Sequence, residues 1–312
     1  MVGSVSVVVP SLGRVERLRE CIGAILRQDV SVPLDVAVVV DGPESGRAID
    51  ELRSAFPGER RIKYDASSAR RGSPSAKNIG SSMVGGEVLV FVDDDTVPAA
   101  GWLSALLKGY EDGIAGVGGS EEKQASLGRL RSMWVRFWGD ATGKVTKSGL
   151  VISNFAPGKT AVEKVDCLAG ANMSFLREAF EGVGGFDANY KGTAYREETD
   201  LCLRIRKKGI LLFVPAARVL HREEQAGGNS PESVRDWNYW YHRNNTYFFW
   251  KNLDDGRRGL RFRHEAVEVT LALGRMLQQR SLTPLTTLRA GTRDGRTAFE
   301  ELTRQRGTRD VV

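Results

Sequence analysis

The chain has 312 residues, of which 41% are hydrophobic and 27% are charged. This composition is ordinary for a globular protein and excludes a disordered, coiled-coil or collagen-like chain. No segment reaches the roughly 18 uninterrupted apolar residues that a membrane-spanning helix needs. The N-terminal MVGSVSVVVPS lacks a basic region followed by a long apolar one, so we expect a cytoplasmic protein without a cleaved secretory signal.

The net charge of +6 is carried by the C-terminal end of the chain. Residues 256–312 hold twelve arginines, no lysine and six acids, so the first 255 residues are neutral. An arginine-rich end indicates an anionic partner, either membrane phospholipid or nucleic acid. The alternative is a solubilising end, because charge runs are often only solvated faces.

The first 120 residues alternate short apolar runs with helical patterns. The predicted strands are residues 5–9, 36–40, 61–64, 88–92 and 114–117, and the predicted helices lie near 18–26, 49–56, 73–83 and 102–110. This alternation predicts an α/β fold with a doubly wound sheet and right-handed crossovers. Ligands of such sheets bind beyond the carboxyl ends of the strands.

The second half is less regular. We expect strands at 165–168, 211–214 and 219–221, short helices near 176–180 and from Glu197, and mostly helix after Pro231. One helical face is expected to be covered by the rest of the protein, and it comprises Phe262, Ala266, Val269, Leu273 and Met276. The chain is therefore divided into a domain at 1–228 and a helical, arginine-rich region at 229–312.

Three adjacent carboxylates follow the apolar strand at 88–92. In an extended segment Asp93 and Asp95 point to one side and Asp94 to the other. Adjacent like charges are costly unless a cation shares them, and carboxylate oxygens suit Mg²⁺ or Mn²⁺. The alternative is a polar strand end with a helix-capping acid.

The same acids also fit a phosphatase signature. Haloacid-dehalogenase-type phosphatases carry DxDx(T/V) after their first strand, and Asp93, Asp95 and Val97 match it, with Asp93 as the nucleophile. Here, however, the motif follows about the fourth strand, so this interpretation ranks second. A third possibility is a non-catalytic protein that binds nucleic acid through the basic tail.

An ordered series of motifs resembles family 2 glycosyltransferases with the GT-A fold. The series is VVVPSLGR, VVVDG, SAKNIG, FVDDDTVP, LAGANMSF, GGFD, REETDLCLRIRKKG and the later His221, covering residues 5 to about 225. The resemblance implies a GT-A mixed sheet flanked by helices. It also implies an inverting enzyme that transfers a sugar from a nucleotide diphosphate sugar to an acceptor hydroxyl.

The resemblance also implies a donor site. Asp41 matches the acid that accepts a hydrogen bond from the nucleotide base, although a turn-forming Asp before Gly is the alternative. Lys77 matches a cation near the phosphates, where the alternative is a solvated helix lysine. The remaining nucleotide-sugar-binding residues implied are Pro10, Ser11, Leu12, Arg14, Asp93, Asp94, Gly170 and Asn172. Leu12 replaces an aromatic residue of many relatives, and Asn172 is alternatively a buried turn residue.

The implied metal ligands are Asp95 and His221, holding Mg²⁺ or Mn²⁺. Imidazole suits Mn²⁺ better than Mg²⁺. Glu198 occupies the position of the general base, with Glu197 as its rival one residue earlier. The alternative for both glutamates is structural, because acids in a first helical turn are stabilised by the helix dipole.

Eight aromatic residues crowd into positions 237–250: Trp237, Tyr239, Trp240, Tyr241, Tyr247, Phe248, Phe249 and Trp250. Their rings either pack inside the protein or form an interfacial belt beside the arginine-rich helices. The belt would place residues 237–312 against the inner face of a membrane and suit a lipid-linked acceptor, with a saccharide as the other acceptor class. We expect no nucleic-acid partner.

Overall fold

The computed structural model describes residues 2–123, 141–222 and 233–309, with side chains up to 305. The chain folds into two compact units. The first comprises Met1–Lys144, Ile152–Asp187 and Leu201–Gly228. The second comprises Val145–Val151, Ala188–Asp200 and Asn229–Val312. Two short segments from the range 1–228 thus belong with the C-terminal helices.

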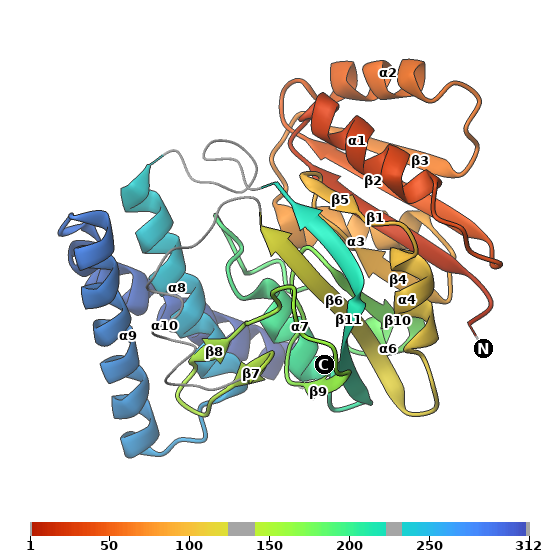
Figure 1. Ribbon diagram of the computed structural model, residues 1–312. Coiled ribbons are helices and arrows are strands. Elements are labelled where there is room, and N and C mark those ends of the chain that lie inside the picture. The colour runs from red at the N-terminus through yellow and green to blue at the C-terminus, as the bar shows by residue number, and fades with distance from the viewer. Residues whose placement is uncertain (1, 124–140, 223–232, 310–312) are drawn as a thin grey trace. The chain divides into compact units, whose positions relative to one another are not determined.

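The first unit is built on a mixed sheet in the order β3-β2-β1-β4-β10-β6-β11-β5, with β9 paired to β11 (Figure 1). Strands β1 (Val5–Ser11), β2 (Leu34–Asp41), β3 (Ile62–Ser67) and β4 (Val88–Phe91) are parallel neighbours. The remaining strands are β5 (Thr96–Pro98), β6 (Ile114–Lys123), β9 (Glu163–Val165), β10 (Met173–Leu176) and β11 (Ile210–His221). A separate pair is formed by β7 (Lys144–Val145) and β8 (Val151–Ile152).

Helices cover both faces of this sheet. On one face, α1 (Val15–Leu26), α2 (Ser45–Ala55) and α4 (Trp102–Lys108) share a core with Val7 and other alternate strand residues. On the other lie α3 (Ser73–Met83) and α6 (Arg177–Glu181). Helix α3 approaches closely at Gly80, where a Cβ atom would come within 2.4 Å of Val8 Cγ1. The predicted α/β fold with a mixed sheet is confirmed.

Two details of the sheet differ from the prediction. Residues 211–214 and 219–221 belong to one strand, β11, whose pairing with β6 shifts register between Val214 and Arg218. The irregularity interrupts the apolar pattern, so the sequence divides one strand into two. Strand β10 is antiparallel to both β4 and β6 in the middle of the sheet and was not predicted.

The second unit is dominated by α8 (Val234–Asn252), α9 (Arg258–Gln279) and α10 (Thr283–Arg309). Helix α7 (Glu197–Ile205) begins in this unit and ends in the first. Helices α8 and α10 touch at two glycines, because a Cβ on Gly291 or Gly295 would come within 2.8 or 2.3 Å of α8 atoms. Within the described ranges, none of the helices combines the length and the apolar run that crossing a bilayer requires.

The aromatic residues of α8 are not an exposed belt. Tyr241, Tyr247, Phe248 and Phe249 are buried, and the four others are half-buried. Phe249, for example, stacks on His264 of α9 with ring centroids 3.9 Å apart. Inward packing, the first of the two interpretations, therefore describes these rings.

Helix α9 packs with a different face from the one predicted. Its buried residues are Leu260, His264, Glu268 and Ala272, each one turn after the last. Three residues of the predicted buried face, Phe262, Val269 and Leu273, are exposed by 72%, 43% and 43%. The expectation that this apolar face is covered is wrong for the described structure.

Candidate active site

The carboxyl ends of β1, β2 and β4 bring several predicted site residues to one edge of the sheet. Ser11 ends β1 and Asp41 ends β2, while Asp93 follows β4 by two residues. Because the three strands are parallel neighbours, these ends lie on the same side.

Asp94 turns into the protein, away from Asp93 and Asp95 as expected, but residues 93–96 form a turn, with the Thr96 N–H donating to the Asp93 carbonyl at 3.1 Å, and not the extended segment that the sequence predicted. The residue is 3% exposed, and its carboxylate accepts hydrogen bonds from the Ser11 hydroxyl at 2.5 Å and from Arg14 Nε at 3.1 Å. Arg14 Nη2 also contacts Asp94 and lies 3.0 Å from Asp95 Oδ2. Hydrogen bonds to Ser11 and Arg14 thus use the Asp94 carboxylate inside the protein. We call these three residues the internal brace.

Asp93, Asp95 and His221 form the one group among the described residues with a spacing suited to a metal ion. One ligand atom from each lies within 4.8 Å of the others. Pairing of β11 with β5 brings His221 opposite Thr96, and the backbone N–H of Arg222 donates to the Asp95 carbonyl at 3.0 Å. His221 Nε2 then stands 3.2 Å from Asp95 Oδ1.

Burial and neighbouring charges shift the pKa values of the residues in and beside this group. Burial would lower the pKa of His221, but the contact with Asp95 and the charges of Asp93 and Glu121 raise it to about 9. Burial would raise the pKa of Asp95, yet His221 and Arg14 together hold it below its ordinary value. Burial raises the pKa of Asp94 despite the opposing effect of Arg14. The site therefore holds Asp95 as a carboxylate.

The donor set fits a divalent metal. Asp95 Oδ1 is buried and, apart from its ion pair with His221 Nε2, has no hydrogen-bond partner among the described residues; His221 Nδ1 is likewise buried without one. Two carboxylates and one imidazole match the ligand preference of Mn²⁺. Arg14 occupies the opposite oxygen of Asp95, so Oδ1 is the oxygen that faces the ligand group.

At the end of β2, Asp41 is 2% exposed and engages Arg71. The Arg71 backbone N–H donates to Asp41 Oδ2 at 2.7 Å, and its Nε donates to Oδ1 at 2.7 Å. Arg71 Nη2 also reaches Asp65 Oδ2 at 2.5 Å. Sequence reasoning missed Arg71, which lies outside the recognised motifs; its one signal was the basic pair Arg70-Arg71 ahead of a helix start.

Lys77 is not a solvated lysine. It is 3% exposed, lies on α3, and has its Nζ 5.3 Å from the centre of the Phe186 ring. Pro10 and Leu12, flanking Ser11 at the end of β1, are half-buried. Burial of an ammonium group is costly without compensating contacts, so the alternative of a solvated helix lysine does not describe Lys77.

Asn172 is completely buried and its side chain is used internally. Its Oδ1 accepts from Trp102 Nε1 at 2.9 Å, and its Nδ2 donates to the carbonyls of Ser120 and Ala217 at 3.1 and 2.8 Å. These contacts favour the alternative of a buried turn residue. Of the LAGANMSF segment, the half-buried Gly170 is left as the candidate for close approach of a ligand.

The two candidate bases open α7. Glu197 is 5% exposed, whereas Glu198 is half-buried and accepts a hydrogen bond from the Thr199 hydroxyl at 3.0 Å. The backbone just before them is strained, because Ala194 and Arg196 have φ values of 53° and 77°. Non-glycine residues with positive φ cost energy and cluster at functional sites.

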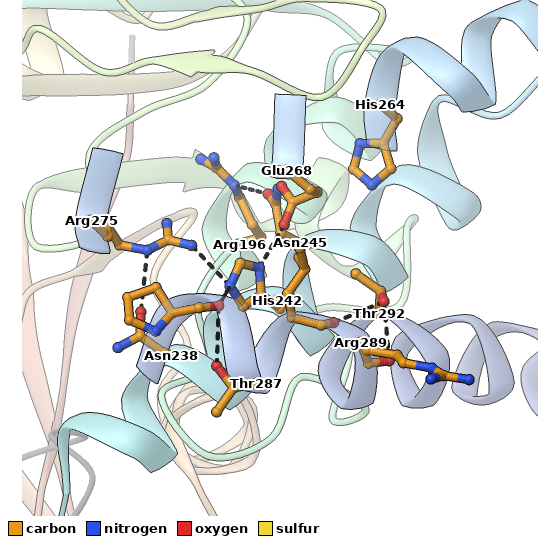
Figure 2. Close-up of polar contacts among 12 residues, drawn as sticks. Arg196, Asn238, His242, Asn245, His264, Glu268, Arg275, Thr287, Arg289 and Thr292 are labelled. Atoms are coloured by element: carbon orange, nitrogen blue, oxygen red, sulfur yellow. Dashed lines mark hydrogen bonds and ion pairs between the residues drawn. The ribbon is translucent and has the colours of Figure 1, made fainter. Parts of the chain in front are cut away.

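A buried polar network holds this strained segment within the second unit. Arg196 Nε donates to Asn245 Oδ1 at 2.8 Å, and Asn245 Nδ2 donates to Glu268 (Figure 2). Glu268 Oε2 lies 2.9 Å from His242 Nδ1. Sequence reasoning missed this network, because Glu268 lies outside the face of α9 that the sequence predicted to be buried.

The mixed sheet, its flanking helices and its acidic edge define a GT-A fold, and comparisons with solved structures agree. The chain is similar to mannosyltransferase PcManGT from Pyrobaculum calidifontis, in complex with GDP-Man and Mn²⁺, with a TM-score of 0.58 and 18% identity over 95% of this chain and 86% of that one. It is also similar to GalNAc-T7 with UDP, GalNAc and Mn²⁺, with a TM-score of 0.56 and 18% identity over 80% of this chain and 50% of that one. At this identity the likeness shows the fold.

The family follows from the sequence match. The model of Glycosyl transferase family 2 matches residues 6–184, and the chain belongs to this family. It is 27% identical to a glucosyl-dolichyl phosphate glucuronosyltransferase of Haloferax volcanii, over 70% of this chain and 68% of that one. It is 30% identical to a GalNAc(5)-diNAcBac-PP-undecaprenol beta-1,3-glucosyltransferase of Campylobacter jejuni, over 40% of each. The phosphatase and the non-catalytic alternatives are set aside.

Proposed function

We propose that this glycosyltransferase transfers a sugar from a nucleotide diphosphate sugar to a hydroxyl of a lipid-linked saccharide, with inversion at the anomeric carbon. The observation that carries the proposal is the group of Asp93, Asp95 and His221 at the carboxyl end of the sheet. Support for the acceptor comes from the similar proteins of Haloferax and Campylobacter, whose names specify dolichyl phosphate and diphospho-undecaprenol substrates.

Donor binding is assigned to the first unit. Asp95 and His221, with Asp93 beside them, would hold Mn²⁺ or Mg²⁺, which supplies positive charge against the pyrophosphate of the donor. Asp41 and Arg71 are proposed to bind the nucleotide base of the donor, and Lys77 is proposed to bind its phosphates. Ser11, Arg14 and Asp94 position Asp95 through their hydrogen bonds rather than by touching the donor. The donor is also proposed to contact the half-buried side chains of Pro10 and Leu12 and the backbone of Gly170.

Glu198 is proposed as the general base. It removes the proton of the acceptor hydroxyl while the oxygen of that hydroxyl bonds to the anomeric carbon. The bond from that carbon to the nucleotide diphosphate breaks in the same step, so attack comes from the opposite face and the configuration inverts. Glu198 is favoured over Glu197 because it is the more exposed of the two.

The C-terminal region completes the proposal. Residues 229–312 are proposed to shape the acceptor side, since the segment that carries Glu197 and Glu198 belongs to the same unit. Peripheral contact of residues 237–312 with the inner face of a membrane would bring the enzyme to a lipid-linked acceptor.

The test combines binding with product analysis. UDP, GDP, dTDP and their sugars are screened by thermal shift with and without Mn²⁺, because a ligand that binds the folded state raises its stability. The preferred donor is then incubated with a polyprenyl diphosphate saccharide, and the released nucleotide and the anomeric configuration are determined. The proposal would be overturned if Mn²⁺ changed the thermal shift with none of the donors, or if the enzyme hydrolysed phosphomonoesters and transferred no sugar.

A further inference from the structure

Helix α9 buries polar residues and exposes apolar ones. The face directed into the second unit carries His264 and Glu268 between Leu260 and Ala272. The opposite face carries Phe262, Val269, Leu273 and Leu277, exposed by 72%, 43%, 43% and 73%. At about 100° per residue these four side chains fall within one narrow stripe along the helix. An apolar stripe toward solvent is the reverse of what a surface helix of a water-soluble domain shows.

The stripe is continuous and long. Its members follow one another by seven, four and four residues, and at about 1.5 Å per residue the stripe runs about 22 Å along the helix. Leu282, three residues after the end of the helix, adds a further large side chain that is 67% exposed. Only two other large hydrophobic side chains of the described residues, Val162 and Val234, are exposed to a similar degree.

Positive charge lies at both ends of the stripe. Arg258 precedes Phe262 by one helical turn, Arg263 follows Phe262 directly, and Arg280 comes one turn after Leu277. All three arginines are exposed and none has an ion-pair partner among the described residues, whereas Arg257 and Arg261 are paired with Asp255 and Asp254. Glu265 is the one exposed acid on α9, and the three unpaired arginines outnumber it, so the charge along this face of the helix is positive.

We propose that α9 is an interfacial helix that lies in the headgroup region of an anionic lipid bilayer, with the stripe Phe262, Val269, Leu273 and Leu277 facing the acyl chains. An apolar face flanked by arginines is the pattern of helices that lie in the plane of a membrane surface. Anionic headgroups pair with the arginines and lipid tails cover the stripe. This inference names the membrane-contact element of the proposed function and rests on it only for the choice of acceptor.

The test is flotation of the full chain with vesicles of phosphatidylcholine alone and of phosphatidylcholine with phosphatidylglycerol at about three to one. We expect co-flotation with the anionic vesicles, weakened by salt. Leu277→Asp and Phe262→Asp should each lower the bound fraction about tenfold, since each removes an apolar side chain from the lipid. Val162→Asp and Val234→Asp are the matched controls, because they change comparably exposed apolar residues outside the stripe.

A second pair of variants tests the charge. Arg258→Gln with Arg263→Gln should reduce binding to the anionic vesicles and leave binding to the neutral ones unchanged. Equal flotation of wild type and Leu277→Asp would overturn the proposal. So would light scattering that shows a dimer which Leu277→Asp dissociates, with no vesicle binding, because a second copy would then cover the stripe.

Turnover separates this inference from the proposed function. The stripe variants should keep donor binding and donor hydrolysis at the wild-type rate while losing vesicle binding. If the variants float like wild type and the enzyme transfers sugar, the interfacial helix is wrong and the transferase stands. If wild type binds vesicles but never turns over a nucleotide sugar, the reverse holds.

Discussion

His242 on α8 and Glu268 on α9 form a fully buried pair, with His242 Nδ1 2.9 Å from Glu268 Oε2. The other ring nitrogen, Nε2, lies 3.1 Å from the Pro284 carbonyl of α10 and 3.1 Å from Arg275 Nη2 of α9. Asn245 donates to the second oxygen of Glu268, so both oxygens of this carboxylate accept hydrogen bonds. Three helices of the second unit are joined around this one buried anion.

The first prediction concerns this pair. Glu268→Gln should lower the free energy of unfolding by about 3 kcal/mol at neutral pH, because the amide has one acceptor oxygen and cannot replace the two carboxylate oxygens that accept hydrogen bonds in this buried network. Burial raises the pKa of Glu268, but His242 and Asn245 outweigh it and hold the pKa below its ordinary value of 4.5. A carboxyl with a lowered pKa stabilises the fold above its ordinary pKa and loses that effect as the pH falls.

The difference between wild type and Glu268→Gln should therefore be constant from about pH 7 to about pH 5 and shrink below about pH 4.5 in urea unfolding experiments. Glu265→Gln is the control, since Glu265 is exposed on the same helix. A difference that persists unchanged down to about pH 3 would mean that the charge of Glu268 contributes nothing.

Much of the first unit was predictable because its signals are local. The strand at 5–9, the helix at 73–83 and the acids after 88–92 each follow from hydrophobic periodicity and from residues that end an element. The separation of Asp94 from Asp93 and Asp95 was predicted correctly, although a turn at residues 93–96 produces it and not the extended segment that was expected. Parallel strands then bring the ends of β1, β2 and β4 together, and this follows from topology alone.

The remainder depended on contacts between residues distant in sequence. Arg14 donates a hydrogen bond to Asp94, which lies 80 residues later in the sequence, and no periodic pattern predicts such a contact. The sequence assigned the wrong face of α9 to the interior. Apolar spacing shows which residues share one side of a helix, but it does not show whether that side packs against the protein. His264 and Glu268 are buried only because α8 and the segment at 145–151 supply polar partners, including the Ser148 carbonyl 3.0 Å from His264 Nδ1.

A second prediction separates a structural from a ligand-binding role of Asn172. Asn172→Ala leaves the Trp102 N–H and the carbonyls of Ser120 and Ala217 buried without their partner. We expect a loss of about 3 kcal/mol in unfolding free energy, with the KM for the donor nearly unchanged. Calorimetry and donor titration of the same preparation give both values. A raised KM with unaltered stability would instead assign Asn172 to the donor.

A third prediction compares two adjacent aspartates. Asp95→Asn removes a carboxylate from the ligand group and should abolish the Mn²⁺-dependent thermal stabilisation by the nucleotide. Asp94→Asn breaks the brace that positions Asp95 and should lower the unfolding free energy by about 3 kcal/mol, with the response to Mn²⁺ weakened but retained, because Asp95 keeps its carboxylate. A full response to Mn²⁺ in Asp95→Asn would show that the cation is not held by Asp95.

The last prediction identifies the base. Glu198→Gln should reduce kcat by about 10²-fold or more with donor affinity unchanged, because the amide cannot accept the acceptor proton. Glu197→Gln is the matched variant, one residue away in the same helical turn, and it should retain most of the turnover. Single-turnover rates with saturating acceptor, together with donor titrations, measure both effects. If Glu197→Gln is the inactive variant and Glu198→Gln remains active, the base is Glu197, and the more exposed carboxylate only supports it.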